Sequence, residues 1–259
     1  MNQYLLTIAH LLRRDLRIFN QTFWGKFVNI CFMMATMIIA FSYFLPAQGL
    51  RAGYGPFVLV GVIAQVGFYD IMSKVTQLII DMEGDKTILH TLSLPLPSWL
   101  VFFQIGLSWS LNSLIISAIL FPLGKLFLFF QFDLSAINYL NLLPIAVINN
   151  MFFGFFALWI TSIIKNMASL GNLFPRIINP LFMFGCFMYS WQTAFTMSPI
   201  LGYLSLSNPL VYVMEGMRAA ILGQDGSLPF WYSFGALTLF TLFFAWDGIR
   251  RLQRRLDCA

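Results

Sequence analysis

Residues 208–223 read Asn-Pro-Leu-Val-Tyr-Val-Met-Glu-Gly-Met-Arg-Ala-Ala-Ile-Leu-Gly, and this stretch decides how the chain is interpreted. Asn208 is a favourable N-cap, Pro209 suits the first helical position, and Gly223 suits the residue that closes a helix. The predicted helix over 209–222 is about 20 Å long, whereas the hydrocarbon core of a bilayer is about 30 Å thick. The helix is therefore apolar enough to enter a membrane but too short to cross it, which indicates a half-buried or re-entrant segment.

The two charged residues of this stretch are Glu215 and Arg218. They lie three positions apart, so they share one face of the predicted helix and can partly neutralise each other. The same stretch also fits a surface helix that lies flat in the membrane interface. Both interpretations stay open at the level of sequence.

The whole chain has the composition of a polytopic membrane protein. Its 259 residues are 59% hydrophobic and only 10% charged, against about 25% charged residues in a soluble domain. The net charge of +5 does not indicate a nucleic-acid partner, because the basic residues collect near the ends of apolar runs instead of forming one patch. Membrane lipid is the expected surrounding.

Hydrophobicity predicts one all-α transmembrane domain over residues 1–259, with six spans at about 23–45, 55–80, 99–123, 139–164, 173–195 and 230–246. Leucines at helical spacing over 4–19, with arginines among them, predict an N-terminal helix that lies at the membrane face. Pro175 and Pro180 predict a bend near the start of the fifth span. The short helix over 209–222 precedes the last span as a re-entrant segment.

The basic residues predict the orientation of the chain, since cytoplasmic loops of membrane proteins are enriched in Lys and Arg. Twelve of them fall on one side of the predicted spans: Arg13, Arg14, Arg17, Lys26, Lys74, Lys86, Lys165, Arg176, Arg250, Arg251, Arg254 and Arg255. Three fall on the other: Arg51, Lys125 and Arg218. We therefore expect both termini in the cytoplasm and the helix over 209–222 outside.

The second predicted span carries an acid and a base, Asp70 and Lys74, in its later half. Their spacing of four residues lets them pair on one face of a helix. Ionisable residues at membrane depth are by default a functional hypothesis. A self-neutralised structural pair near the cytoplasmic end fits the spacing equally well.

The sequence gives no pattern for a metal or redox site. The cysteines Cys31, Cys186 and Cys258 lie far apart, and no two of them have metal-ligand or redox spacing. The histidines His10 and His90 have no neighbouring ligand. We expect no metal bound to this chain.

Enzyme chemistry is also not expected. The chain lacks the G-x-x-x-x-G-K-[ST] motif that cradles nucleotide phosphates, so any ATP hydrolysis belongs to another polypeptide. The acids are scattered, and no nucleophile has a histidine base. An ion-coupled secondary transporter or channel remains the alternative, with Asp70 and Lys74 as its ionisable pair inside a span.

Two motifs make the chain resemble the ABC-2-type permeases, the membrane subunits of ATP-driven exporters. One is Asn208-Pro209-Leu210, then four largely apolar residues, Glu215, and Arg218 three residues later, just before the last span. The other is the loop over 81–98, with an acidic turn, a short apolar helical run and a Leu-Pro pair. The chain departs from the family in having Ser98-Trp99 where an arginine often follows the proline.

The resemblance implies that the short helix in the loop over 81–98 docks into the ATPase. The residues to which it assigns this role are Glu83, Gly84, Lys86, Thr87, Leu89 and Leu92. A solvated turn between spans is the alternative for this loop. The outer re-entrant helix is represented by Asn208, Pro209, Glu215 and Arg218.

The resemblance further implies a cell inner (cytoplasmic) membrane location, a second permease copy as partner, and two ATPase subunits that hold ATP and Mg. The substrate stays open between amphipathic drugs, lipids and glycans. Aromatic residues in the fourth span suit ring stacking with glycans, but packing against lipid explains them equally well; they are Phe152, Phe153, Phe155, Phe156 and Trp159.

Overall fold

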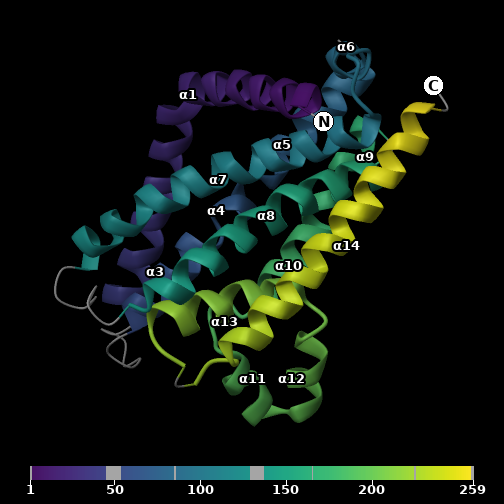
Figure 1. The fold of residues 1–259 in the computed structure, drawn as a ribbon. Coiled ribbons are helices and arrows are strands. Elements are labelled where there is room, and N and C mark those ends of the chain that lie inside the picture. The colour runs from purple at the N-terminus through teal and green to yellow at the C-terminus, as the bar shows by residue number, and fades with distance from the viewer. Residues whose placement is uncertain are drawn as a thin grey trace.

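The computed structural model describes residues 2–44, 54–84, 86–128, 137–164, 166–224 and 226–257. These residues form helices joined by turns, with no β-strand among them, so the predicted all-α class is confirmed (Figure 1). The helices are α1 (Asn2–Ile38), η1 (Ile39–Phe44), α3 (Tyr54–Ala64), α4 (Val66–Tyr69), α5 (Ile71–Glu83), α6 (Thr87–Leu92), α7 (Ser98–Leu128), α8 (Tyr139–Ile163), α9 (Met167–Leu170), η3 (Phe174–Ile178), α10 (Asn179–Met183), α11 (Trp191–Met197), α12 (Pro199–Ser205), α13 (Pro209–Ile221) and α14 (Phe230–Asp257).

In the described part of the chain, four helical runs are long and apolar enough to cross a membrane. They are Tyr4–Phe44, Ser98–Leu128, Tyr139–Ile163 and Phe230–Leu256. They correspond to the first, third, fourth and sixth predicted spans. The chain is thus built as a membrane protein, while the count of six spans stays a prediction.

The first of these runs is longer than any membrane requires. Its 41 residues are about 60 Å of helix, twice the hydrocarbon thickness. Figure 1 shows that α1 changes direction, so that its first half lies across one end of the bundle and its second half runs down the side. The predicted interfacial helix over 4–19 and the first predicted span are therefore parts of one helical run.

The second predicted span is not one helix, because it is divided into α3, α4 and α5 at Gln65 and Asp70. A break inside a membrane protein leaves carbonyl groups that need donors from neighbouring helices. Asn149 of α8 donates to the Ala64 carbonyl at 2.8 Å, and Ser117 of α7 donates to the Ile63 carbonyl at 3.4 Å. Polar side chains of the surrounding helices therefore compensate for this break.

The fifth predicted span over 173–195 is not one continuous helix either. It consists of η3, α10 and α11, with the chain leaving helical geometry over 184–190. Pro175 and Pro180 each lie in the first turn of a short helix, where proline is tolerated. The break comes later, where Cys186 adopts a left-handed backbone with φ of 59°.

The last helix, α14, continues eleven residues beyond its predicted end at 246 and carries the C-terminal arginines. Arg251 contacts Asp247 one turn earlier, with 2.6 Å between Nε and Oδ2. Arg255 donates to the Ile164 carbonyl at the end of α8 at 2.7 Å. The Arg255 contact holds the extended end of α14 against α8.

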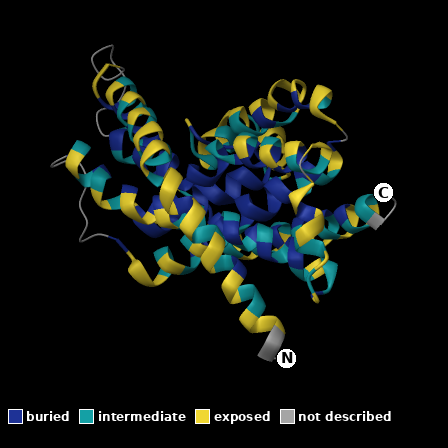
Figure 2. Cartoon of the chain, turned by 90° about the horizontal axis from the view of Figure 1, so that it is seen from above, coloured by how far each residue is buried: buried dark blue, intermediate teal, exposed yellow. Residues whose placement is uncertain are grey.

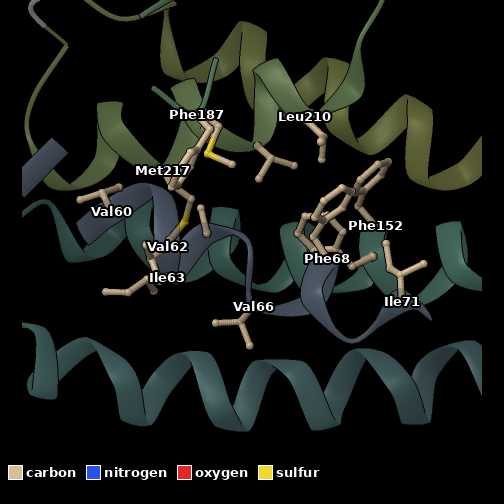
Figure 3. Close-up of a cluster of buried hydrophobic side chains, with 14 of the residues drawn as sticks. Val60, Val62, Ile63, Val66, Phe68, Ile71, Phe152, Phe187, Leu210 and Met217 are labelled. Atoms are coloured by element: carbon tan, nitrogen blue, oxygen red, sulfur yellow. The ribbon is translucent and has the colours of Figure 1, made fainter. Parts of the chain in front are cut away.

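The hydrophobic core is built around α8 and α13. Figure 2 shows buried residues gathered in the centre of the bundle, with exposed residues around them. Figure 3 shows Phe152 of α8, Phe68 of α4, and Leu210 and Met217 of α13 among the side chains that meet there. Because all 13 residues of α13 are buried, this segment is not a helix lying on the surface of the protein.

The two ends of the bundle carry different features. Figure 1 places α6 and both termini toward one end, and α11 and α12 at the opposite end with α13 beside them. The predicted topology likewise puts the termini and the loop over 81–98 on one side of the membrane and the helix over 209–222 on the other.

Candidate functional site

The helix that the sequence singled out forms as predicted, to within one residue at its end. The Asn208 side chain accepts a hydrogen bond from the Leu210 amide at 3.0 Å and donates to the Leu181 carbonyl at 2.8 Å. Pro209 is the first residue of α13, and Gly223 after its end has φ of +96°. Asn208 therefore caps α13 and also fastens it to α10.

Arg218 of α13 binds the backbone of the broken fifth segment. Its Nη1 donates to the Cys186 carbonyl at 2.7 Å and to the Tyr189 carbonyl at 3.3 Å. Its Nη2 donates to the Phe187 carbonyl at 2.7 Å. The guanidinium carbon also lies 3.4 Å from the ring centroid of Phe57, a cation–π distance.

Glu215 completes the arrangement from the same face of α13. Its Oε1 accepts from the amide of Trp191, the first residue of α11, at 3.1 Å. Its Oε2 accepts from the Leu228 amide, just before α14, at 3.0 Å. The predicted pairing with Arg218 is present, with 3.4 Å between Oε1 and Nη1.

We call these two side chains and the backbone groups that they bind the Glu215–Arg218 clamp. Glu215 is fully buried and Arg218 is 2% exposed. Irregular backbone at membrane depth persists only where its polar groups are satisfied inside the protein. The clamp supplies donors to three carbonyls of 184–190 and acceptors to two amides, so it stabilises the non-helical segment.

The second predicted pair is part of a larger cluster, which we call the Lys26–Asp70–Lys74 cluster. The Lys26 Nζ lies 3.1 and 3.2 Å from the two carboxylate oxygens of Asp70. The Lys74 Nζ lies 3.5 Å from Asp70 and donates to Ser113 at 2.8 Å and to the Trp109 carbonyl at 3.2 Å. The cluster therefore connects α1, α5 and α7.

The loop predicted to dock an ATPase contains a defined short helix, α6. Asp81 of α5 fixes its first turn, since its carboxylate accepts from the Ile88 amide at 2.8 Å and from the amide and hydroxyl of Thr87. Lys86 holds a left-handed backbone with φ of 54° before the helix begins. These bonds connect α6 to the end of α5.

The side chains of α6 divide into an anchored set and an outward set. Ile88 is 4% exposed and packs in the bundle, and Leu92 is half-buried against it. Leu89 is 45% exposed. The other predicted docking residues, Glu83, Gly84, Lys86 and Thr87, are exposed beside it.

Comparison with known proteins adds no further assignment. No protein family matches the chain, and no curated protein is significantly similar to it. Within the described ranges, no three His, Cys, Asp or Glu side chains gather to form a group that could hold a metal ion.

Two parts of these sites were missed by sequence reasoning. Lys26 lies inside the first predicted span, so the rule that an ionisable residue at membrane depth is a functional candidate applies to it as it does to Asp70. Cys186 was considered only for its thiol, whereas its backbone carbonyl is what Arg218 binds. No local pattern marks that carbonyl, because its partner lies 32 residues away.

Proposed function

We propose that the chain is the membrane permease subunit of an ATP-driven exporter of the ABC-2 type, working with a separate ATPase subunit. The observation that carries the proposal is α6. It is a short helix tied to α5 by Asp81, with Leu89 outward, at the end of the bundle where both termini lie (Figure 1). Leu89 and the exposed polar residues beside it give a partner protein a surface to contact, on a helix that is anchored to the bundle.

The contacts of α6 give a mechanical route into the membrane helices. A displacement of α6 acts on α5 through the Asp81 carboxylate. From α5 it acts on α1 through Asp70 and Lys26, and on α7 through Lys74 and Ser113. Closure of an ATPase pair, driven by ATP and Mg held on the ATPase, would thus reach three helices at once.

At the opposite end, the Glu215–Arg218 clamp would form the outer part of the pathway. We place that end outside the cell inner membrane and both termini in the cytoplasm, which the twelve-to-three distribution of basic residues supports. Two copies of the permease would enclose the pathway with two ATPase subunits below. The substrate is an amphipathic molecule of the drug, lipid or glycan class.

The test is a photo-cross-linking residue placed at position 89 in living cells. Capture of a polypeptide that carries the G-x-x-x-x-G-K-[ST] motif supports the proposal, and the matched control at exposed Arg254, at the same end, should capture much less. The variant Leu89→Asp should lose export while the protein stays in the membrane. A variant that exports normally, or a purified chain that transports without any ATPase, contradicts the proposal.

The Lys26–Asp70–Lys74 cluster is the one observation that favours an ion-coupled carrier as a second candidate. Its carboxylate is engaged by two lysines, so a proton or sodium ion would have to displace one of them. For that mechanism Asp70→Asn should abolish transport driven by an ion gradient. For the exporter, transport stays dependent on ATP with or without the gradient.

A further inference from the structure

A groove of about 800 Å³ lies between α1 and α7. We call it the α1–α7 groove. One wall is the part of α1 between residues 13 and 23, and the other is the outward face of α7 at Ile115 and Ile119. Figure 1 shows that α1 changes direction along its length, so that its first half and its second half meet α7 from two sides. The groove is therefore open to whatever surrounds the bundle.

The α1 wall lies where the helix passes from the membrane surface into the hydrocarbon. The run Tyr4–Phe44 is about twice as long as the hydrocarbon core is thick, so part of it must lie outside that core. The charged stretch over 13–17 belongs to that outer part. Trp24 follows it and is 69% exposed, and tryptophan is enriched at membrane interfaces. We therefore expect Arg13 and Arg17 at the level of the lipid head groups.

The polar side of the groove is cationic. Arg13, Arg17 and Asn20 all line it, and their spacing of four and then three residues places them on one face of α1. Both arginines are exposed, and among the described residues no carboxylate forms an ion pair with either of them. The nearest acid in the sequence, Asp15, is paired with Arg14 at 2.9 Å. The groove thus has two positive charges and no acidic residue in its lining.

The rest of the groove is apolar. Ile115 and Ile119 lie four residues apart on α7, and each is 37% exposed. They belong to a helix that is long and apolar enough to cross a membrane. Phe19 and Phe23 follow the arginines along α1, with 5.7 Å between their ring centroids. A ligand that matches both parts of the lining must carry a negative charge next to an apolar chain.

We propose that the α1–α7 groove binds an anionic phospholipid. The phosphate lies at Arg13 and Arg17, since guanidinium groups form paired hydrogen bonds to phosphate oxygens. The first part of the acyl chains lies along Phe23, Ile115 and Ile119. Basic pockets beside membrane-spanning helices are suited to such acidic head groups. The occupant is a lipid and not a free phosphate ion, because a soluble anion cannot use the apolar surface. The inference does not depend on the proposed export function.

The test uses the full chain purified in an uncharged detergent. It is mixed with a phosphatidylglycerol that carries a photoreactive diazirine close to the start of one acyl chain, and the modified peptides are identified by mass spectrometry after irradiation. The lipid should label α1 near Phe23 and α7 over 115–119. Unlabelled phosphatidylglycerol in excess should suppress this labelling, whereas phosphatidylcholine with the same chains, which has no net charge, should not.

Variants identify the groups that select the lipid. Arg13→Gln and Arg17→Gln should each weaken phosphatidylglycerol about fivefold, which corresponds to about 1 kcal/mol for one basic residue near an anionic lipid. Both side chains are exposed, so neither substitution should disturb folding. Arg254→Gln is the matched control, because it removes the same charge from an exposed position on α14 that does not line the groove. It should change the affinity less than about twofold, since distant surface charges are screened.

Four results would overturn the proposal. Phosphatidylcholine competes as well as phosphatidylglycerol, so the arginines do not select an anionic lipid. Glycerol phosphate without acyl chains displaces the photoreactive lipid as well as the whole lipid does. Arg13→Gln and Arg17→Gln bind no more weakly than Arg254→Gln. The folded protein acquires no label at either wall of the groove, as when a second copy of the chain covers it. None of these results involves ATP or an ATPase, so they are separate from failure of the exporter proposal.

Discussion

Removing the cation of the Glu215–Arg218 clamp by Arg218→Met should open the segment over 184–190. The substitution leaves a fully buried Glu215 without its positive partner and removes the donors to the carbonyls of Cys186, Phe187 and Tyr189. Breaking a buried ion pair by removing one partner costs about 3–5 kcal/mol. We expect the loss to appear locally, because Arg218 is bound to this segment more than to any other part of the chain.

The Cys186 thiol provides the assay. It is fully buried within the segment, so a thiol reagent reaches it only when the segment opens. The measurement is the labelling rate of Cys186 in a background with Cys31→Ser and Cys258→Ser. A loss of 3 kcal/mol raises the opening equilibrium, and with it the labelling rate, about a hundredfold.

A matched control and an intermediate variant make the result interpretable. Arg176→Met removes an exposed arginine nearby in η3 and should change the rate less than about twofold. Arg218→Lys keeps the charge but has fewer donors in a different geometry, so it should be intermediate, about tenfold. If Arg218→Met labels no faster than the Arg176→Met control, the clamp does not hold the segment and our reasoning is wrong.

Three further predictions concern stability, measured as the free energy of unfolding in mixed micelles. Asp70→Asn should lower the free energy of unfolding by about 3 kcal/mol, because it leaves the buried Lys74 without a counter-charge. Lys26→Met, at a more exposed position, should lower it by about 1 kcal/mol. Equal losses would contradict this ranking. Gly154→Ala should lower the free energy of unfolding by about 2 kcal/mol, because the new Cβ would lie 2.5 Å from the backbone carbonyl oxygen of Gly106 in α7. Gly235→Ala, whose new Cβ would have nothing within 4 Å, is its control and should be neutral or stabilising. Asn208→Ala should cost about 1–2 kcal/mol through loss of the N-cap of α13, and an unchanged value would argue against that cap.

The features predicted well from sequence depend on local patterns. The predicted fourth span over 139–164 corresponds to α8, Tyr139–Ile163, because a long apolar run with a turn at each end is best satisfied by one continuous helix. The start of α13 was predicted because Asn208 and Pro209 have strong positional preferences. Pairing of Glu215 with Arg218 follows from their spacing alone.

The features that were missed depend on contacts between distant residues. The helix break at Gln65 is compensated by Asn149 and Ser117, which are far away in the sequence. The break over 184–190 requires Arg218, and neither predicted proline lies at it. The recruitment of Lys26 to Asp70 spans 44 residues. Apolar composition predicts where a chain enters the membrane, but not where a helix can be interrupted inside it.

The account depends most directly on the two ends of the bundle facing opposite sides of the membrane. The measurement is labelling of single cysteines, His90→Cys in α6 and Tyr203→Cys in α12, by a reagent that does not cross membranes. Both parent side chains are exposed. We predict that intact cells label position 203 only, and that position 90 is labelled once the cells are opened. Labelling of position 90 in intact cells, with position 203 protected, would place α6 out of reach of a cytoplasmic ATPase and contradict the account.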